Sequence, residues 1–420
     1  MQAKRQTRRN PFGPLSANVE LDRRMMQRAL ALAKRGRGYV EPNPMVGCVI
    51  VRNGRIIGEG YHRRFGGPHA EIEALRACKA NPCGATAYVT LEPCSHFGKT
   101  SPCVDALVEA GVARVVTPLC DPNPLVNGSG VRALRRAGIE VEVGVLADET
   151  AELLAPFLTR VRLERPYVIA KWAESADPGA PGLVTPPGQS KWISCEKSRR
   201  WVHRLRARVD AIMVGAGTVP ADDPMLTARD VPIRRRAMRI VVDGRLRIPE
   251  TCRLVKTADQ YATVVFTTRR AAQSAKAKRL QRRGVEIVAC RARGDRIALS
   301  DMLRSPILHD VTNLLVEGGP TLLNAFFAAG VVDEADVFVA PIRIGSGEVT
   351  PRFQRSALRH AVSTSPPIAV RKRRSGSDQF VHLRYAPRKS RDSDTTPRAP
   401  LATREPGAMI CSPLARSPVV

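Results

Sequence analysis

The sequence predicts an α/β protein built from two different domains. Segments with the patterns of strands and helices alternate along most of the chain, which is typical of sheets covered by helices. The chain has 420 residues, well above the roughly 150 of an average domain. Its hydrophobic fraction of 43% is ordinary for a globular protein, so each domain can bury a core. No internal repeat relates the two halves.

Residues 20–146 are expected to form the first domain, in which helices cover a mixed sheet. An apolar stripe at helical spacing predicts a helix over 21–33 that ends near Gly36. Asn53-Gly54 separates two apolar runs and predicts a hairpin between them. Strands are expected over 45–51, 55–61, 85–91, 114–119 and 139–145, and further helices over 69–78, from about 101, and over 129–137.

Residues 166–386 are expected to form the second domain, with a largely parallel sheet covered on both faces. Residues 147–165 are expected to form a helix and a linker. Residues 1–19 and 387–420 are expected to be disordered tails, because neither can bury enough apolar surface to offset its conformational entropy. In the second domain, strands are expected near 167–172, 210–214, 238–243, 262–267, 284–290, 313–317 and 334–341, and helices near 195–208, 271–283, 297–304 and 320–329.

The net charge of +28 raises the possibility of a nucleic-acid partner. Only 5% of residues are aromatic, and few lie beside basic clusters such as 371–374, so the stacking platforms of a single-strand binder are hard to find. A solvated basic surface that attracts phosphorylated small molecules is the simpler interpretation, and no specific nucleic-acid partner is expected. A nucleic-acid deaminase or a basic nucleic-acid-binding protein stays open as an alternative.

No stretch approaches the roughly 18 apolar residues of a membrane span, and no apolar segment follows the basic start of the chain. Neither a membrane span nor a secretory signal is therefore expected. The 10 cysteines do not form a disulfide pattern, since six fall in the first 120 residues and the others are scattered. The sequence favours a reducing cytoplasmic location, with metal or packing roles for some cysteines.

Three residues of the first domain have the chemistry of a catalytic zinc site. His69 opens a predicted helix, and Cys94 and Cys103 follow within the run 93–103. One imidazole and two thiolates suffice for zinc while leaving the fourth position to water. Ser101 and Pro102 are expected to be the N-cap and first residue of a helix, which would place Cys103 at its positive end and favour the thiolate.

Glu71 lies two residues after the predicted zinc ligand His69, so its side chain is expected to turn toward the reacting water without binding the metal. A carboxylate there can take a proton from water and deliver it to a leaving amine. Zinc nucleobase deaminases use this arrangement, so hydrolytic deamination is the predicted chemistry. The alternative is a structural zinc site closed by Cys83 or His96, whereas Cys48 is expected to pack in the core.

Five segments extend this pattern, namely 42–51, His62, 68–71, 90–103 and 121–124. Together they resemble the deaminase domain of the bifunctional riboflavin-biosynthesis deaminase–reductase family. The long insert between the two cysteines distinguishes this family from cytidine and tRNA deaminases. The resemblance covers essentially all of residues 20–146.

The resemblance implies a cytidine-deaminase-like three-layer α/β fold with zinc bound by His69, Cys94 and Cys103 and with Glu71 as the proton shuttle. The implied substrate is the diaminohydroxyphosphoribosylaminopyrimidine made from GTP. Asn43 and Lys99 match family positions that bind this substrate. An amide can recognise a ring edge, and an ammonium can bind a phosphate. A solvated Lys99 is the alternative.

In this family a dihydrofolate-reductase-like α/β domain follows, which uses NADPH to reduce the ribosyl group to a ribityl chain. The segments 190–193, 205–207, 210–219, 221–229 and 316–320 match that domain. The implied cofactor contacts are Ala173, Trp192, Thr218, Asp222, Gly318 and Gly319. The implied substrate contacts are Lys171, Ser190, Arg206, Leu226, Arg229 and Glu317. A homo-oligomer is also expected from the resemblance.

Two of these features have a physical rationale. Gly318 and Gly319, between a strand and a helix, allow the backbone to approach a phosphate. Arg206 and Arg229 can clamp a phosphate through paired hydrogen bonds.

One segment of the second domain departs from the family pattern. At 176–183 a leucine is replaced by Ala176 and a glycine by Pro178, and the segment before Ser190 is about three residues longer. Proline fixes its own backbone angle and restricts the residue before it, so the usual turn cannot form there. An enzyme that only deaminates, with a degenerate second domain, is therefore an alternative.

Overall fold

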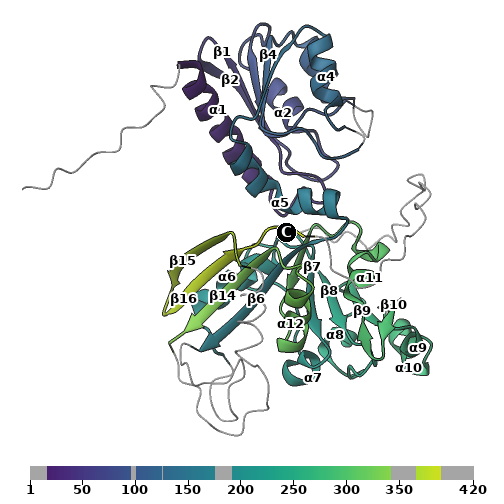
Figure 1. Ribbon diagram of the computed structural model, residues 1–420. Coiled ribbons are helices and arrows are strands. Elements are labelled where there is room, and N and C mark those ends of the chain that lie inside the picture. The colour runs from purple at the N-terminus through teal and green to yellow at the C-terminus, as the bar shows by residue number, and fades with distance from the viewer. Residues whose placement is uncertain (1–16, 96–100, 125, 176–191, 342–365, 389–420) are drawn as a thin grey trace, which may run out of the picture.

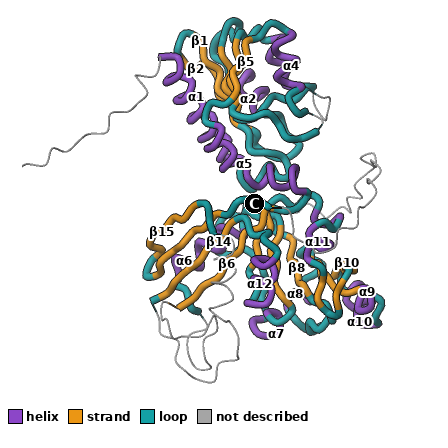
Figure 2. Tube along the Cα trace, viewed as in Figure 1, coloured by secondary structure: helices purple, strands orange, loops and turns teal. Residues whose placement is uncertain are grey.

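The computed structural model describes residues 17–95, 101–124, 126–175, 192–341 and 366–388. The chain forms two α/β units, each with its own sheet (Figure 1). Figure 2 shows helices beside the strands in both units, so the predicted fold class is confirmed. None of the helices in these ranges is long and apolar enough to cross a membrane.

The first unit contains a five-stranded sheet in the order β2-β1-β3-β4-β5. β1 pairs antiparallel with β2 and β3, whereas β3, β4 and β5 are parallel, so the sheet is mixed as predicted. Asn53 and Gly54 both have positive φ angles, which is the turn geometry that joins a tight hairpin. The strands are β1 (Gly47–Arg52), β2 (Arg55–Tyr61), β3 (Thr86–Val89), β4 (Arg114–Thr117) and β5 (Glu140–Val143).

Helices cover both faces of this sheet and complete the three layers. Side chains alternate along β1, so that Val49 and Val51 pack against α1 and α5, while Cys48 and Ile50 face α2 and α3. The packing role predicted for Cys48 is therefore confirmed. The helices are α1 (Ala17–Ala33), α2 (Ala70–Arg76), α3 (Cys103–Glu109), α4 (Ser129–Arg136) and α5 (Ala147–Leu163), and the short helix η1 (Lys34–Gly36) follows α1.

Two segment boundaries differ from the sequence-based expectation. Because α1 begins at Ala17, residues 17–19 extend that helix instead of belonging to the predicted tail. Residues 147–163 form one continuous helix, and its Leu154 and Phe157 are buried in the core of the first unit. This segment is therefore a structural layer of the first unit and not simply a linker.

The second unit contains a nine-stranded sheet in the order β10-β9-β8-β7-β13-β6-β14-β16-β15. Neighbouring strands are parallel except at β16, which pairs antiparallel with both β14 and β15. β15 and β16 form an edge hairpin that the sequence did not predict. The basic cluster 371–374 lies on β15 and is exposed. Charged edge strands discourage pairing with other chains. The strands are β6 (Tyr167–Ser175), β7 (Ala211–Gly215), β8 (Met238–Val242), β9 (Thr263–Thr268), β10 (Val285–Cys290), β13 (Asn313–Val316), β14 (Glu334–Ala340), β15 (Ala369–Ser375) and β16 (Asp378–Arg384).

Two buried clusters occupy the two faces of this sheet. One includes Leu323 and Phe326 of α12, and the other includes Leu205 of α6 and Leu280 of α10. The predicted helix over 271–283 is divided, because Thr268 and Ser274 each cap a separate helix. The helices are α6 (Glu196–Arg206), α7 (Thr218–Asp222), α8 (Arg253–Lys256), α9 (Arg269–Ala272), α10 (Ala275–Arg282), α11 (Leu299–Leu303), η2 (Pro306–Leu308) and α12 (Pro320–Ala328), and β11 (Ala292–Arg293) and β12 (Arg296–Ile297) form a small separate sheet.

Candidate functional site

The three predicted zinc ligands meet in the first unit. His69 is the N-cap of α2, Cys103 is the first residue of α3, and Cys94 lies in the loop after β3. The Nδ1 atom of His69 is 3.2 Å from Cys103 Sγ and 3.5 Å from Cys94 Sγ. Their ligand atoms all lie within 4.8 Å of one another. One imidazole and two thiols at this separation fit a zinc site with three protein ligands.

The hydrogen bonds of this cluster favour a thiolate. The Cys103 thiol, the His69 imidazole and the backbone N–H of Cys103 stabilise the Cys94 thiolate and lower the pKa of Cys94 to about 4. The hydrogen bond to Cys94 and burial raise the pKa of Cys103. A bound metal would displace the protons shared in this cluster, because zinc binds thiolates and neutral imidazole.

The cap of α3 differs from the prediction. Pro102 occupies the N-cap position and Cys103 begins the helix, whereas the sequence predicts the cap one residue earlier at Ser101. Pro102 has no N–H, so it cannot serve as a backbone donor at this helix start. The Cys103 sulfur still lies at the positive end of the helix, as expected.

Glu71 lies beside the cluster without being one of its three ligands. The residue is on α2, only 3% exposed, and burial raises the pKa of its carboxyl to about 7. Within the described ranges no fourth His, Cys, Asp or Glu joins the three ligands. The exposed Cys83 is not part of the group, and His96 lies outside the described residues. The arrangement therefore fits an open zinc site.

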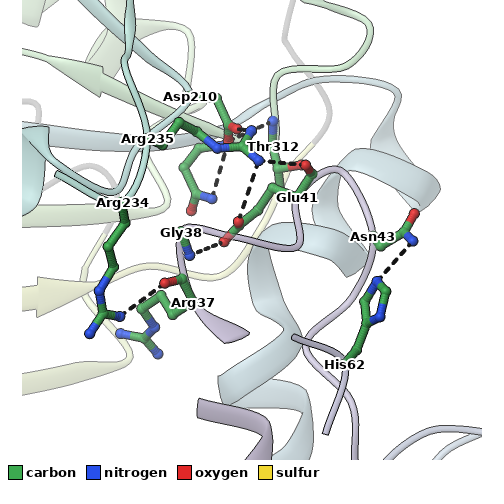
Figure 3. Close-up of polar contacts among 10 residues, drawn as sticks. Arg37, Gly38, Glu41, Asn43, His62, Asp210, Arg234, Arg235 and Thr312 are labelled. Atoms are coloured by element: carbon green, nitrogen blue, oxygen red, sulfur yellow. Dashed lines mark hydrogen bonds and ion pairs between the residues drawn. The ribbon is translucent and has the colours of Figure 1, made fainter. Parts of the chain in front are cut away.

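Asn43 contacts His62, whose ring lies beside that of the zinc ligand His69 (Figure 3). The sequence predicted no separate role for His62. The His62 Nδ1 atom is 2.9 Å from the carbonyl oxygen of Pro68, which can only accept, so Nδ1 carries the proton. The other nitrogen, Nε2, then accepts a hydrogen bond from Asn43 Nδ2 at 3.2 Å. The His62 and His69 rings are 5.5 Å apart. Lys99 lies outside the described residues.

Glu92 fixes the loop that carries Cys94 and was not predicted as a functional residue. Its buried carboxylate accepts the backbone N–H groups of Asp121, Gly128 and Val131 at 2.8 to 3.0 Å. These bonds hold the segment after β4 against the loop, next to the zinc ligand Cys94. The sequence signal that could have identified Glu92 is its position two residues before the zinc ligand Cys94.

The second unit contains a cleft of about 1950 Å³ at the ends of its central strands. Its walls include most of the residues predicted for the cofactor and second substrate. Leu226 differs, because its side chain is 2% exposed and packs in the core, while the neighbouring Met225 lines the cleft. Ser190 lies outside the described residues. The predicted residues in the walls are Lys171, Ala173, Trp192, Arg206, Thr218, Asp222, Arg229, Glu317, Gly318 and Gly319.

Arg206 and Glu317 form a buried ion pair in this cleft. The Arg206 Nε and Nη2 atoms each donate to a different carboxylate oxygen at 2.7 Å. Burial alone would raise the pKa of Glu317, but the Arg206 charge and hydrogen bonds, helped by Lys171, lower it to about 2. In this structure the paired donors of Arg206 hold Glu317, so the phosphate clamp expected of Arg206 stays a prediction. Arg229 is the other predicted phosphate ligand on the cleft wall.

The helix start at α12 also lines the cleft. Gly319 is the N-cap of this helix, and Pro320 follows it. The first N–H groups of a helix lack internal partners, so this edge can receive a phosphate of the cofactor. His203, one turn before Arg206 on α6, also lines the cleft, and its Nδ1 accepts the Arg229 N–H at 3.2 Å. That helical spacing is the sequence signal that could have identified His203.

Comparison with known proteins assigns both units. The cytidine and deoxycytidylate deaminase zinc-binding region matches residues 19–119, and the RibD C-terminal domain matches residues 166–374. Riboflavin biosynthesis protein RibD of Aquifex aeolicus is 43% identical over 328 residues, which cover 78% of this chain and 89% of that protein. The chain belongs to the RibD family. RibD of Escherichia coli is 41% identical over 339 residues, which cover 77% of this chain and 89% of that protein.

Solved structures of this family agree with the fold. RibD of Acinetobacter baumannii is 35% identical with a TM-score of 0.72, and the match covers 88% of this chain and all of that one. A deaminase/reductase from Thermotoga maritima is 34% identical, with the same TM-score and coverage. The chain is thus a bifunctional enzyme of riboflavin biosynthesis, with a zinc-dependent deaminase domain and an NADPH-dependent reductase domain. The predicted family, fold and cofactors are confirmed.

We expect Cys94→Ser to lose zinc, because a neutral hydroxyl is a poor substitute for a thiolate ligand. The measurement is the metal content of the purified chain, which should fall well below about one zinc per chain. Cys83→Ser is the matched control, since Cys83 is exposed and outside the cluster. Full zinc retention by Cys94→Ser would overturn the ligand assignment.

We expect Glu317→Gln to destabilise the second domain by about 3 kcal/mol at pH 7, because it leaves buried Arg206 without its counter-charge. The folded-state pKa of about 2 lies below the ordinary value, so ionised Glu317 stabilises the fold above about pH 4.5. That contribution is lost as the pH falls toward 2. The difference in unfolding free energy between wild type and variant should therefore be smaller at pH 4 than at pH 7, and an equal or larger difference at pH 4 would contradict this assignment.

Proposed function

We propose that the first domain deaminates diaminohydroxyphosphoribosylaminopyrimidine and that the second reduces the ribosyl group of the product to ribityl. The observation that carries this proposal is the open His69–Cys94–Cys103 cluster with Glu71 beside it, in the same chain as the cleft of the second domain. The Thermotoga maritima relative is named for these two reactions. We further propose that the enzyme acts in the cytoplasm as a homo-oligomer.

In the deaminase, His69, Cys94 and Cys103 would hold zinc, which supplies Lewis-acid activation of the attacking water. Glu71 moves the protons. Its carboxylate accepts a proton from the water and later donates one to the departing amine, so that ammonia leaves and the ring carbon gains an oxygen. The pKa of Glu71 near 7 suits a group that must both accept and donate.

Asn43 and Lys99 position the substrate in the deaminase. Asn43 donates through its amide nitrogen to His62, so its carbonyl oxygen is the atom suited to accept from an amino group of the ring. Lys99 supplies a positive charge for the phosphate. The implied order of events is binding by these two residues and then attack at the carbon that faces the zinc site.

In the reductase, NADPH supplies the hydride, and the cleft binds both partners. We assign Ala173, Trp192, Thr218, Asp222, Gly318 and Gly319 to the cofactor. Lys171, Arg229 and Glu317 face the same cleft and are assigned to the substrate, with Ser190 as a further contact that the family resemblance implies. Arg206 acts through its ion pair, because it fixes the Glu317 carboxylate in one orientation.

The direct test is to incubate the zinc-loaded chain with the phosphoribosylaminopyrimidine substrate, with and without NADPH, and to follow product mass. Without NADPH we expect only the deaminated product. With NADPH we expect deamination followed by reduction. If deaminated product accumulates without reduction in the presence of NADPH, the alternative of a degenerate second domain is favoured. The altered segment 176–183 of that domain lies outside the described residues. No reaction in either condition would contradict the proposed substrate.

We expect Glu71→Gln to lower the deaminase kcat by about 100-fold to 10000-fold, because the amide cannot shuttle protons. Zinc content should stay at the wild-type level, since Glu71 is not a ligand. Reduction of separately supplied deaminated intermediate should also be unchanged, which controls for folding. Loss of zinc from this variant would instead show that Glu71 binds the metal.

A further inference from the structure

The loop of residues 37–43 in the deaminase domain lies against the reductase domain (Figure 3). Arg235 donates from Nη2 to the carbonyl oxygen of Glu41 at 2.6 Å. Arg234 donates to the carbonyl oxygen of Arg37 at 3.0 Å, and its guanidinium lies 5.4 Å from the centre of the Tyr39 ring. Two consecutive arginines of the second domain thus hold the backbone of this loop.

Arg235 is itself held firmly within the reductase domain. Its Nη1 pairs with the Asp210 carboxylate. The other oxygen of Asp210 accepts the backbone N–H groups of Thr312 and Asn313 at 3.2 and 2.8 Å, just before and at the start of β13. The backbone N–H of Arg235 also donates to the Ala207 carbonyl at 2.9 Å. Arg235 is therefore a fixed support for the loop, in contrast to a solvated surface arginine.

Hydrogen bonds within the loop connect Glu41, whose carbonyl Arg235 holds, to Asn43. The Glu41 side chain is 5% exposed, and its Oε1 accepts the Gly38 N–H at 2.9 Å, which closes the loop on itself. A Cβ added at Gly38 would lie 3.0 Å from Arg208 Cβ, so the two domains approach closely here. The Asn43 N–H bonds the Val40 carbonyl at 2.9 Å, so Asn43 is tied to the same closed turn.

Asn43 links this loop to the zinc site. The carbonyl that Arg235 holds belongs to Glu41, two residues before Asn43. The Asn43 amide donates to His62, whose ring lies beside that of the zinc ligand His69. A shift of the loop backbone would therefore move the Asn43 amide relative to the zinc site, where the reacting carbon must sit.

We propose that Arg235 of the reductase domain is a positioning residue for the deaminase. By holding the Glu41 carbonyl, it sets the place of the Asn43 amide in the other active site. The inference rests on the proposed function, in which Asn43 binds the deaminase substrate. Arg235 does not touch the zinc ligands or Glu71, so its loss should weaken substrate binding more than it slows the chemical step.

The test is to measure deamination by the full chain carrying Arg235→Ala. Misplacement of a binding group by about 1 Å can cost on the order of 100-fold, and we expect a rise in KM of roughly ten-fold with kcat within about two-fold of wild type. Zinc content and the reduction of separately supplied deaminated intermediate should be unchanged. Arg236→Ala is the matched control, because Arg236 is the adjacent, exposed arginine, and its KM should equal that of wild type.

A double-variant cycle connects the effect to Asn43. Asn43→Ala alone should raise KM, and adding Arg235→Ala to it should raise KM little further, because both act through the same amide. Fully additive effects would overturn the inference, as would an unchanged KM in Arg235→Ala. If Arg235→Ala does not fold, Arg235→Gln takes its place, since one amide cannot reach Asp210 and Glu41 together, and an unchanged KM there overturns the inference equally.

Failure of the proposed function is distinguishable from failure of this inference. A wild-type chain that does not deaminate the pyrimidine would reject the proposed substrate. Wild-type turnover with an effect of Asn43→Ala but none of Arg235→Ala would reject only the role of Arg235. Wild-type turnover with no effect of Asn43→Ala would reject the proposed role of Asn43 and, with it, the role of Arg235.

Discussion

His69 and Cys103 each stand at the start of a helix, and both helices pack against the same face of the five-stranded sheet. Ala74 of α2 and Leu107 of α3 are fully buried in that shared core. Close packing of this kind permits little sliding, so the imidazole and the thiol stay 3.2 Å apart. The metal site, the placement of Glu71 in the first turn of α2, and the deaminase chemistry all depend on these two helix starts remaining opposed.

The zinc site could be predicted because its signals are local. Each ligand lies beside a predicted helix start or in a short motif, and the residue types themselves specify zinc. The edge hairpin β15–β16 could not be predicted in the same way. Strand β15 carries four consecutive basic residues at 371–374, and these hide the alternation of apolar and polar side chains that identifies a strand. Only its pairing with β16, and of β16 with β14, establishes it as part of the sheet.

Contacts between residues far apart in the sequence also could not be predicted. Arg206 lies in the cleft as predicted, but its Nε and Nη2 atoms donate to Glu317, 111 residues away, and this partner could not be predicted from the sequence around Arg206. The bond from Arg235 to Glu41 spans 194 residues and joins two domains. Arg235 lies in none of the segments that match the family, and an arginine that supports a backbone carbonyl has the same sequence signature as a solvated one. Such a role emerges only from the folded arrangement.

The two active sites share one structural support at the end of α6. Arg206, in the last turn of this helix, orients Glu317 in the reductase cleft, and the carbonyl of the next residue, Ala207, accepts the N–H groups of both Arg234 and Arg235. A displacement of this helix end would therefore disturb both sites. Allosteric coupling would require a second arrangement of these contacts, whereas the paired bonds of Arg206 and the two-ended bridge of Arg235 favour a single one. The supports of Glu317 and of the 37–43 loop therefore meet at the end of α6, where the two domains are in contact.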